Sequence, residues 1–192
     1  GLELNGTLFA SVVTDPIEVT EVVGSTLPSM LRVSNAIQPT RTTGAELLAR
    51  WRHDGASVTG TYTFIRASEY ASDLATRARV ALVPRHAVGV VGMHETEDVG
   101  RLGLELYYTG RQTLEGNPYR TESAPYLIVG FLIERHVGPV RLFLNAENLG
   151  DVRQTRFDPL LLPVRGAGGR WTTDAWTELS GRTFNGGVRW AF

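Results

Sequence analysis

The sequence of 192 residues contains no cysteine and no lysine. Without cysteine, the chain can form neither a disulfide framework nor a thiolate metal site. All 19 basic residues are therefore arginines, a compositional bias to which we attach no function. The formal net charge is -1, so there is no electrostatic reason to expect nucleic acid or a strongly acidic partner.

A long hydrophobic run is also missing. No stretch reaches the roughly 18 apolar residues that a membrane-spanning helix needs. Hydrophobic residues make up 42% of the chain, as expected where only alternate residues of a strand face lipid. The chain opens on Gly1-Leu2-Glu3-Leu4, without methionine or a secretory signal. We therefore expect a mature protein or an excerpt that begins inside a strand.

Recognisable catalytic and metal-binding patterns are absent as well. The four histidines, at positions 53, 86, 94 and 136, do not have the spacing of metal ligands. No Ser-His or Asp-His pair can be assigned from the sequence. We therefore predict no metal, no cofactor and no enzymatic activity.

What the sequence does contain is alternation, which is most regular at its C-terminal end. From Phe184 to Phe192 every second residue is apolar or small, the period of a strand with two different faces. The chain closes on an aromatic residue, and Trp and Phe favour the interface between hydrocarbon and lipid headgroups. This pattern favours a strand in a lipid-embedded barrel, with an ordinary edge strand ending in Phe as the alternative.

The same end carries a spaced motif. Asn185, Gly187, Trp190 and Phe192 fit the pattern polar-x-Gly-x-x-apolar-x-aromatic. The pattern resembles the C-terminal signal by which the assembly machinery of bacterial outer membranes recognises its barrels. We therefore predict an assembly signal at these four residues.

Alternation predicts seven further strands, at 2–12, 43–52, 58–64, 86–94, 101–111, 126–134 and 140–147. Pro39 interrupts the alternation and predicts a protruding or edge-like segment before Thr43. In the strand at 86–94, Val88 and Val90 compete with Val91 and Met93 for the apolar face. Its faces therefore stay unassigned.

The connections between these strands alternate in length. Links near 54–55, 95–99 and 138–139 are short, whereas those at 14–30, 66–84, 112–123 and 150–177 are long. Short turns at one rim and long loops at the other are typical of outer-membrane barrels, whose short side is periplasmic. The sequence therefore predicts an all-β, antiparallel, up-and-down transmembrane β-barrel segment of about eight strands.

Aromatic and charged residues fit this arrangement. Two girdles are expected, with Trp51, Trp190 and Phe192 at the periplasmic rim and Phe64, Tyr108 and Phe184 at the outer rim. The charged residues between the outward apolar positions are candidates for the lumen wall, although simple solvation also explains them. They are Glu46, Arg50, Arg101, Glu105, Arg111, Arg141 and Glu147. We expect ligand contacts from the loops 112–123 and 150–177, including Trp171 and Trp176.

Three segments together resemble one family. Residues 145–151, Asn-Ala-Glu-Asn-Leu-Gly-Asp, followed by Arg153-Gln154-Thr155, resemble the Asn-Leu-x-Asp motif in the penultimate strand of TonB-dependent receptors. Asn35 followed by Thr43-Gly44-Ala45-Glu46 is similar to that family's "N…GxE" strand. Residues 181–192 resemble its closing strand. The resemblance covers most of the chain, in the right order.

This resemblance implies that residues 1–192 are the C-terminal barrel segment of a larger receptor of about 22 strands. The plug domain and the upstream strands would lie outside the sequence. Such receptors import a siderophore, cobalamin or glycan across the bacterial outer membrane. The implied partners are outer-membrane lipid, the barrel assembly machinery, a small-molecule or glycan ligand, and TonB through the missing N-terminal region.

Three alternatives remain open at this point. A self-contained eight-stranded outer-membrane barrel would have a structural or adhesive role. A soluble lipocalin-like carrier would place the apolar face inside and the charged face outside. An outer-membrane enzyme is a further possibility that only an activity assay could reveal.

Overall fold

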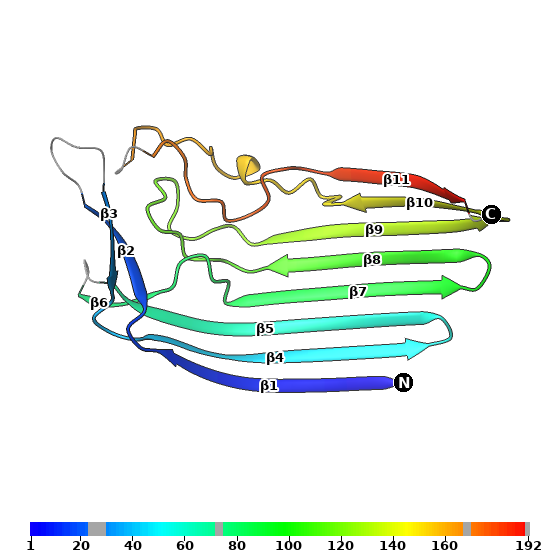
Figure 1. Ribbon diagram of the computed structural model, residues 1–192, viewed down its shortest axis with the longest axis horizontal. Helices are drawn as coiled ribbons and strands as arrows, with labels where there is room; N and C mark the ends of the chain where they lie inside the picture. Colours follow the sequence, from blue (N-terminus) through cyan, green and yellow to red (C-terminus); the bar gives the residue numbers. More distant parts are fainter. Residues whose placement is uncertain (23–29, 72–74, 167–169, 191–192) are drawn as a thin grey trace.

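A single antiparallel sheet dominates the computed structural model, which describes residues 1–22, 30–71, 75–166 and 170–190 (Figure 1). Eight strands follow one another in sequence order across this sheet, so the predicted all-β, up-and-down fold of about eight strands is confirmed. They are β1 (Leu2–Val13), β4 (Thr40–His53), β5 (Ala56–Ala71), β7 (His86–Thr96), β8 (Gly100–Thr109), β9 (Tyr126–Val137), β10 (Val140–Glu147) and β11 (Thr183–Trp190).

Three short strands lie outside the eight of the main path: two in regions that the sequence interpreted as loops, and one in the segment before Thr43 interpreted as protruding or edge-like. β2 (Ile17–Val22) pairs with β3 (Met30–Asn35), and β6 (Thr76–Arg79) pairs with the far end of β5. The prediction of loops at 14–30 and 66–84 was therefore wrong in part. Side-chain hydrogen bonds, which an alternation pattern cannot reveal, also hold β6 in place. One Nη of Arg77 donates to the Ser68 carbonyl at 2.7 Å and to the Pro39 carbonyl at 3.0 Å.

Short turns and long loops lie at opposite ends of the sheet, as predicted (Figure 1). One two-residue turn is Asp54-Gly55, with φ of 41° and 74°. Two consecutive residues at positive φ are what a type I′ hairpin turn requires. A side chain at residue 55 would also lie 2.2 Å from the Glu95 carbonyl oxygen, so glycine is needed there for two reasons.

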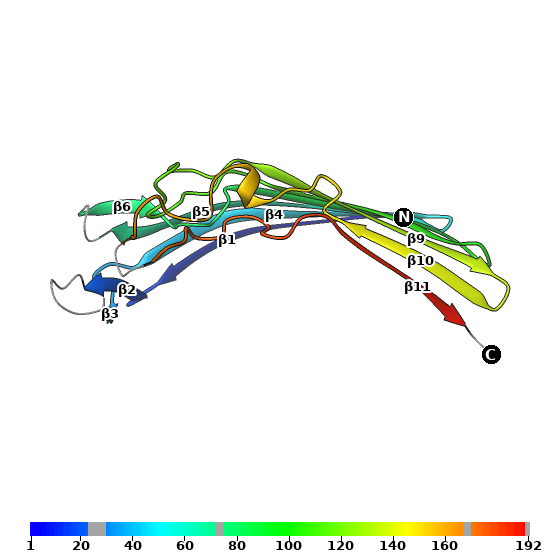
Figure 2. The same ribbon diagram turned by 90° about the horizontal axis from the view of Figure 1, so that it is seen from above.

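The sheet is twisted and bent along its strands (Figure 2). β1 and β11 form its two edges, and within the described ranges they do not pair with each other. The sheet is therefore a section of a barrel wall that is not closed. In the described part of the chain no helix is long and apolar enough to cross a membrane; the one helix described there is a single 3-10 turn, η1 (Gln154–Arg156).

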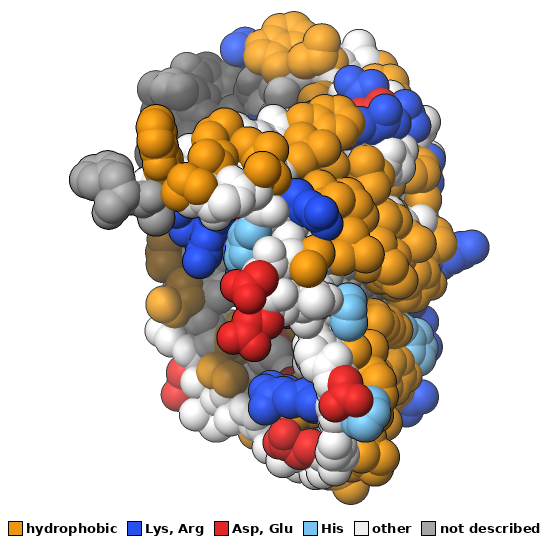
Figure 3. Space-filling model, turned by 90° about the vertical axis from the view of Figure 1, so that its right-hand side faces the viewer, with side chains coloured by type: hydrophobic (Ala, Val, Ile, Leu, Met, Phe, Trp, Pro, Cys, Tyr) orange, Lys and Arg blue, Asp and Glu red, His pale blue; other side chains and the backbone are white. Residues whose placement is uncertain are grey.

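The strand register separates the side chains into two faces. Along one row, Leu4 lies opposite Ala49; along another, Leu104 lies opposite Phe131. We call this side the apolar face; Figure 3 shows hydrophobic side chains gathered along one side of the sheet. Its exposed large residues are Leu2, Leu4, Leu8, Val12, Leu47, Trp51, Val58, Leu102, Leu104, Tyr108, Leu127, Ile133, Val137, Leu142, Leu144, Phe184, Val188 and Trp190.

The register also assigns the strand that the sequence left undecided. Val88 lies opposite Tyr62 and Tyr108, and Val90 lies opposite Leu106. Both valines therefore belong to the apolar face, while Val91 and Met93 belong to the other one. Gly89, on that second face, leaves room for the Thr61 hydroxyl, because a Cβ there would lie 2.8 Å from Thr61 Oγ1.

Aromatic residues occupy both ends of the apolar face. Trp51 and Trp190 lie near the short turns, while Phe64, Tyr108 and Phe184 lie near the long loops. This is the distribution expected for two interfacial girdles. Phe192, which the sequence assigns to the inner girdle and to the assembly signal, lies outside the described residues.

Candidate binding surface at the outer rim

The face opposite the apolar one carries most of the charge of the strands. Six of the seven predicted lumen-wall residues lie on it: Glu46 and Arg50 on β4, Arg101 and Glu105 on β8, and Arg141 and Glu147 on β10. We call this side the polar face. Arg111 lies beyond the end of β8, where its guanidinium is 3.8 Å from the Glu122 carboxylate.

The polar face does not gather these candidates into one site. Arg50 is 3.4 Å from Glu3, and Arg101 is 3.3 Å from Glu134, so these charges are paired along the sheet. No group of three or more possible metal ligands is found among the described residues. The charges of the polar face are therefore distributed over the strands and paired in part with neighbouring strands.

Two glycines on the polar face lie beneath phenylalanine rings of the neighbouring strand. Phe9 is paired with Gly44, and Phe143 is paired with Gly187. A Cβ at Gly44 would lie 2.4 Å from Phe9 Cζ, and one at Gly187 would lie 2.6 Å from Phe143 Cε1. Covering a strand glycine with a cross-strand aromatic ring stabilises the pairing. Gly187, predicted as part of the assembly signal, therefore also has a packing role.

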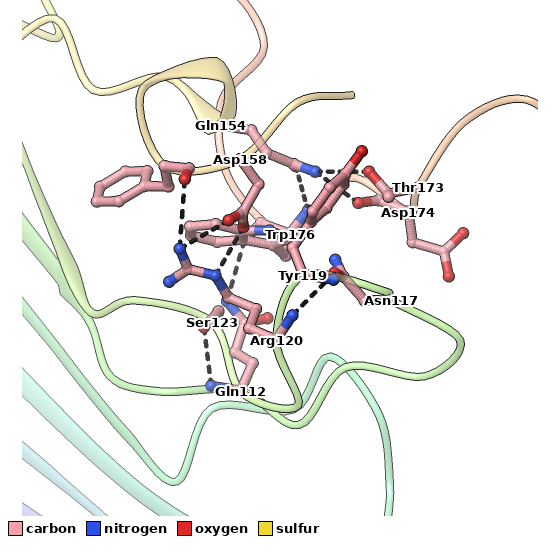
Figure 4. Close-up of polar contacts among 11 residues, drawn as sticks. Gln112, Asn117, Tyr119, Arg120, Ser123, Gln154, Asp158, Thr173, Asp174 and Trp176 are labelled. Atoms are coloured by element: carbon pink, nitrogen blue, oxygen red, sulfur yellow. Dashed lines mark hydrogen bonds and ion pairs between the residues drawn. The ribbon is translucent and has the colours of Figure 1, made fainter. Parts of the chain in front are cut away.

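The long loops at the outer rim hold most of the buried side chains. Loops 112–123 and 150–177 contact each other, and at their junction lie Gln112, Leu114, Ser123, Gln154, Asp158, Thr173 and Trp176, all at most 9% exposed. We call this group the loop cluster; Figure 4 labels its members apart from Leu114.

Gln154, at the start of η1, is fully buried at the centre of the loop cluster. Its amide nitrogen donates to the Asp174 carbonyl at 2.8 Å and to Thr173 Oγ1 at 3.2 Å. Its amide oxygen accepts from the backbone N–H of Trp176 at 2.9 Å. A buried amide with both ends bonded avoids the cost of an unmade hydrogen bond, and it fixes residues 173–176 against the 3-10 turn.

Gln112 connects the first loop to the same tryptophan. Its Nε2 donates to the Trp176 carbonyl at 3.1 Å. Its backbone N–H donates to Ser123 Oγ at 3.0 Å, and its carbonyl accepts from the Ser123 N–H at 2.8 Å. Gln112 therefore closes its own loop and attaches it to the second one.

Arg120 adds charge and packing to the junction. Its guanidinium is 2.7 Å from both carboxylate oxygens of Asp158, and it also lies over the Trp176 ring at 5.9 Å. Two-pronged arginine–carboxylate pairs are among the stronger polar contacts in proteins. Phe157 packs on the other side of the junction, 5.2 Å from the Trp176 ring centre.

The two tryptophans predicted to contact ligand differ in accessibility. Trp171 is 55% exposed and lies beside Arg165, whose guanidinium is 5.3 Å from its ring centre. Trp176 is only 3% exposed. Trp171 is therefore available to a ligand in this arrangement, whereas Trp176 is part of the scaffold.

The segment Asn148–Asp151 forms a defined corner after β10. The Asn148 side chain bonds Val152 twice, accepting from its N–H and donating to its carbonyl, both at 2.8 Å. Asp151 accepts from the backbone N–H of Arg182 at 3.1 Å, which ties the corner to the start of β11. A Cβ at Gly181 would lie 2.1 Å from Asp151 Oδ1, so only glycine permits this approach.

Positive charge surrounds the Asp151 carboxylate. The Arg182 N–H bond and the nearby guanidinium groups of Arg153 and Arg156 hold the pKa of Asp151 below its ordinary value. Arg153 lies 3.0 Å from the carboxylate, and Arg156 also forms an ion pair with it. The aspartate of the predicted motif is thus the centre of a charged junction between β10 and β11.

With this geometry in view, comparison with known proteins is informative. The family model described as "TonB dependent receptor-like, beta-barrel" matches residues 1–149. The chain belongs to the TonB-dependent receptors. Members of this family are outer-membrane proteins of Gram-negative bacteria, and they act as receptors and transporters.

Among solved structures, the ferric-catecholate import receptor Fiu of E. coli K12, in its closed form, has a similar fold. The TM-score is 0.63 at 18% sequence identity, and the match covers 97% of this chain. It covers 25% of Fiu, so the chain spans about a quarter of that receptor's length. No curated protein sequence matches the chain.

Sequence reasoning missed the residues that organise the receptor's outer loops. Gln154 lies within the segment that carries the family resemblance, but nothing in the sequence gave it a role. Gln112 and Gln154 are 42 positions apart, and both bind the backbone of Trp176. Such contacts do not recur at a regular spacing along the sequence, so no periodic pattern predicts them. The available signal was that both glutamines lie in long loops.

Proposed function

We propose that residues 1–192 form the C-terminal part of the barrel of a TonB-dependent receptor that imports a scarce ligand across the outer membrane. The observation that carries this proposal is the division of one sheet into an exposed apolar face and a charged face, in a chain that belongs to this family. The apolar face would contact lipid, and the polar face, with Glu46, Arg50, Arg101, Glu105, Arg141 and Glu147, would line the lumen.

The exposure of the apolar face argues against the soluble carrier. A lipocalin-like protein would enclose its apolar residues, whereas Leu8 is 86% and Val188 is 69% exposed. Exposing such a surface to water is strongly unfavourable, with a free-energy cost of roughly 25 cal/mol for each Å² of apolar area. Acyl chains remove that cost.

The ligand belongs to the siderophore, cobalamin or glycan class in our proposal, and energy is supplied by TonB through a region outside this sequence. Ferric-catecholate import is the role of Fiu, and a siderophore is the first of the three classes to test. We also propose that the chain is a transporter rather than an enzyme, because members of its family are transporters.

Uptake by cells that carry or lack the full-length receptor tests this function. The probes are an iron-loaded catecholate siderophore, cyanocobalamin and a maltodextrin, each radiolabelled. We expect accumulation of one probe to require both the receptor and TonB. Uptake that needs the receptor but continues without TonB, or a receptor absent from the outer-membrane fraction, would contradict the proposal.

The predicted assembly signal has its own test. Deleting Phe192 from the full-length receptor should reduce its insertion into the outer membrane, because the assembly machinery would lose the terminal aromatic residue of the signal. Insertion is measured as the heat-modifiable form in outer-membrane fractions. Unchanged insertion would remove the role given to Asn185, Gly187, Trp190 and Phe192 as a unit.

A further inference from the structure

A pocket of about 430 Å³ lies at the long-loop end of the sheet. It is located where β5 changes its partner, since pairing with β7 ends at Phe64 and pairing with β6 begins at Ser68. Five of its twelve lining residues are arginines and none is acidic. The arginines are Arg41, Arg66, Arg79, Arg85 and Arg111.

The charge of this pocket is only partly compensated. Glu122 lies 3.0 Å from Arg79 and 3.8 Å from Arg111. In the described ranges, no carboxylate forms an ion pair with Arg41, Arg66 or Arg85 within 4.0 Å. The pocket therefore presents an excess of guanidinium groups, which favour phosphate oxygens because their N–H donors match them in pairs.

The register places three of these arginines on the apolar side of the sheet. Ser68 lies opposite both Arg41 and Arg79, and Arg66 lies opposite Thr43, which in turn lies opposite Ala10. Ala10 shares its face with Leu8 and Leu4, because all three occupy even-numbered positions of β1 and strand side chains alternate between faces. Arg41, Arg66 and Arg79 therefore lie on the opposite side of the sheet from the charged residues assigned to the lumen.

An aromatic group lies directly below the pocket on the same face. The Tyr62 hydroxyl and His86 Nδ1 are 2.9 Å apart, and the rings of Phe64 and His86 are 5.3 Å apart. The Arg66 guanidinium lies 5.7 Å from the centre of the Phe64 ring. With a strand rise of about 3.3 Å per residue, the backbone of Arg66 lies roughly 7 Å beyond that of Phe64, on the headgroup side of the aromatic girdle.

We propose that this pocket binds the phosphate groups of a lipid in the outer leaflet of the outer membrane. The inference rests on the proposed function, because it requires the apolar face to lie in lipid. The guanidinium groups of Arg41 and Arg66 bind the phosphates, and the acyl chains lie along Leu4 and Leu8 of β1 and Leu47 of β4. A soluble anion on its way through the barrel would instead approach from the polar face.

Native mass spectrometry of the full-length receptor, isolated from outer membranes in detergent, tests the pocket. The probe is diphosphorylated lipid A, titrated against the wild type and the double variant R41Q/R66Q. The matched control is R52Q, which removes an arginine from the short-turn end of β4. We expect about tenfold weaker binding in the double variant, from the loss of charge-assisted bonds, and no change in R52Q.

Two further arms separate the sources of phosphate. Dephosphorylated lipid A should bind the wild type as weakly as diphosphorylated lipid A binds the double variant. Inorganic phosphate at millimolar concentration should not displace the lipid. Displacement by phosphate alone, equal binding of both lipids, or equal binding by wild type and R41Q/R66Q would overturn the proposal.

Folding is checked by heat-modifiable gel mobility. If R41Q/R66Q does not fold, the single variants R41Q and R66Q and the charge-preserving R41K/R66K replace it. The singles should each weaken lipid binding, and R41K/R66K should weaken it less than either. Outer-membrane location and probe uptake are measured separately, so failure of the lipid site and failure of the transport function give different results.

Discussion

The strands of this receptor segment expose large apolar side chains, whereas its outer loops bury polar ones. On the strands, large apolar residues such as Leu8 and Val188 are exposed, at 86% and 69%. In the loops, the polar residue Gln154 is fully buried. The backbone ladder holds the sheet together, and in our proposal acyl chains cover its apolar face. The loops, in contrast, build a small core of their own.

Reversing the polarity of the apolar face should have the largest effect. Leu104→Arg places a charge near the middle of β8, where it should destabilise the receptor in lipid vesicles by roughly 2–4 kcal/mol. The measurement is denaturant unfolding of the full-length protein in a bilayer. Glu105→Gln, one residue away on the polar face, should change stability by less than about 1 kcal/mol. Equal effects of the two would contradict the division into faces.

Crowding a glycine of the polar face should have an intermediate effect. Gly187→Ala forces the Phe143 ring to move, since the new Cβ would lie 2.6 Å from it, at a cost of about 1–3 kcal/mol. Insertion yield and bilayer unfolding report the change. The double variant Phe143→Ala/Gly187→Ala should recover part of the loss. If Gly187 acts only as an assembly signal, Phe143→Ala will recover nothing.

Removing the central amide of the loop cluster should loosen the loops without affecting the strands. Gln154→Met leaves the Trp176 N–H and the Asp174 carbonyl without their partner, a local cost of about 1–3 kcal/mol. Hydrogen exchange should accelerate at residues 173–178, while the amides of β8 and β9 stay protected. Gln112→Met should have a smaller effect, since its side chain makes a single bond to the Trp176 carbonyl. Faster exchange in β8 would show that the two regions are not independent.

The smallest effect concerns the corner at Asp151. Because its pKa is lowered in the folded state, the carboxylate stabilises the fold above its unfolded pKa, and this stabilisation is lost as pH falls through the lowered value. At pH 7 the Tm of the wild-type receptor should therefore be higher than the Tm of the Asp151→Asn variant. This difference should shrink below the ordinary aspartate pKa of 3.8. A difference that stays constant down to pH 2.5 would show that Asp151 acts through shape alone.

The strands could be predicted from the sequence because their signal is local. Leu102, Leu104 and Leu106 alternate with Arg101 and Glu105, and the period of two identifies the strand without any neighbour. β7 shows the limit of this signal. Its valines occupy both faces, and only the pairing of Val88 with Tyr62 and Tyr108 decides between them.

The loop cluster and the arginine pocket could not be predicted, for a different physical reason. The pocket gathers Arg41 from β4, Arg66 from β5 and Arg111 from beyond β8, and these positions become neighbours only when β5 changes partners. β6 itself was interpreted as loop, because its four residues carry no apolar alternation. The family resemblance identified Asn148 and Asp151 as noteworthy, but the bonds to Val152 and Arg182 that explain them required coordinates.

The two glutamine amides have a mechanical consequence. Gln112 holds the carbonyl of Trp176 and Gln154 holds its N–H, so one residue's peptide groups join two loops that are distant in the chain. Neither loop can swing away from the mouth of the barrel without breaking a bond that also restrains the other. Loops 112–123 and 150–177 should therefore move together, as one rigid unit.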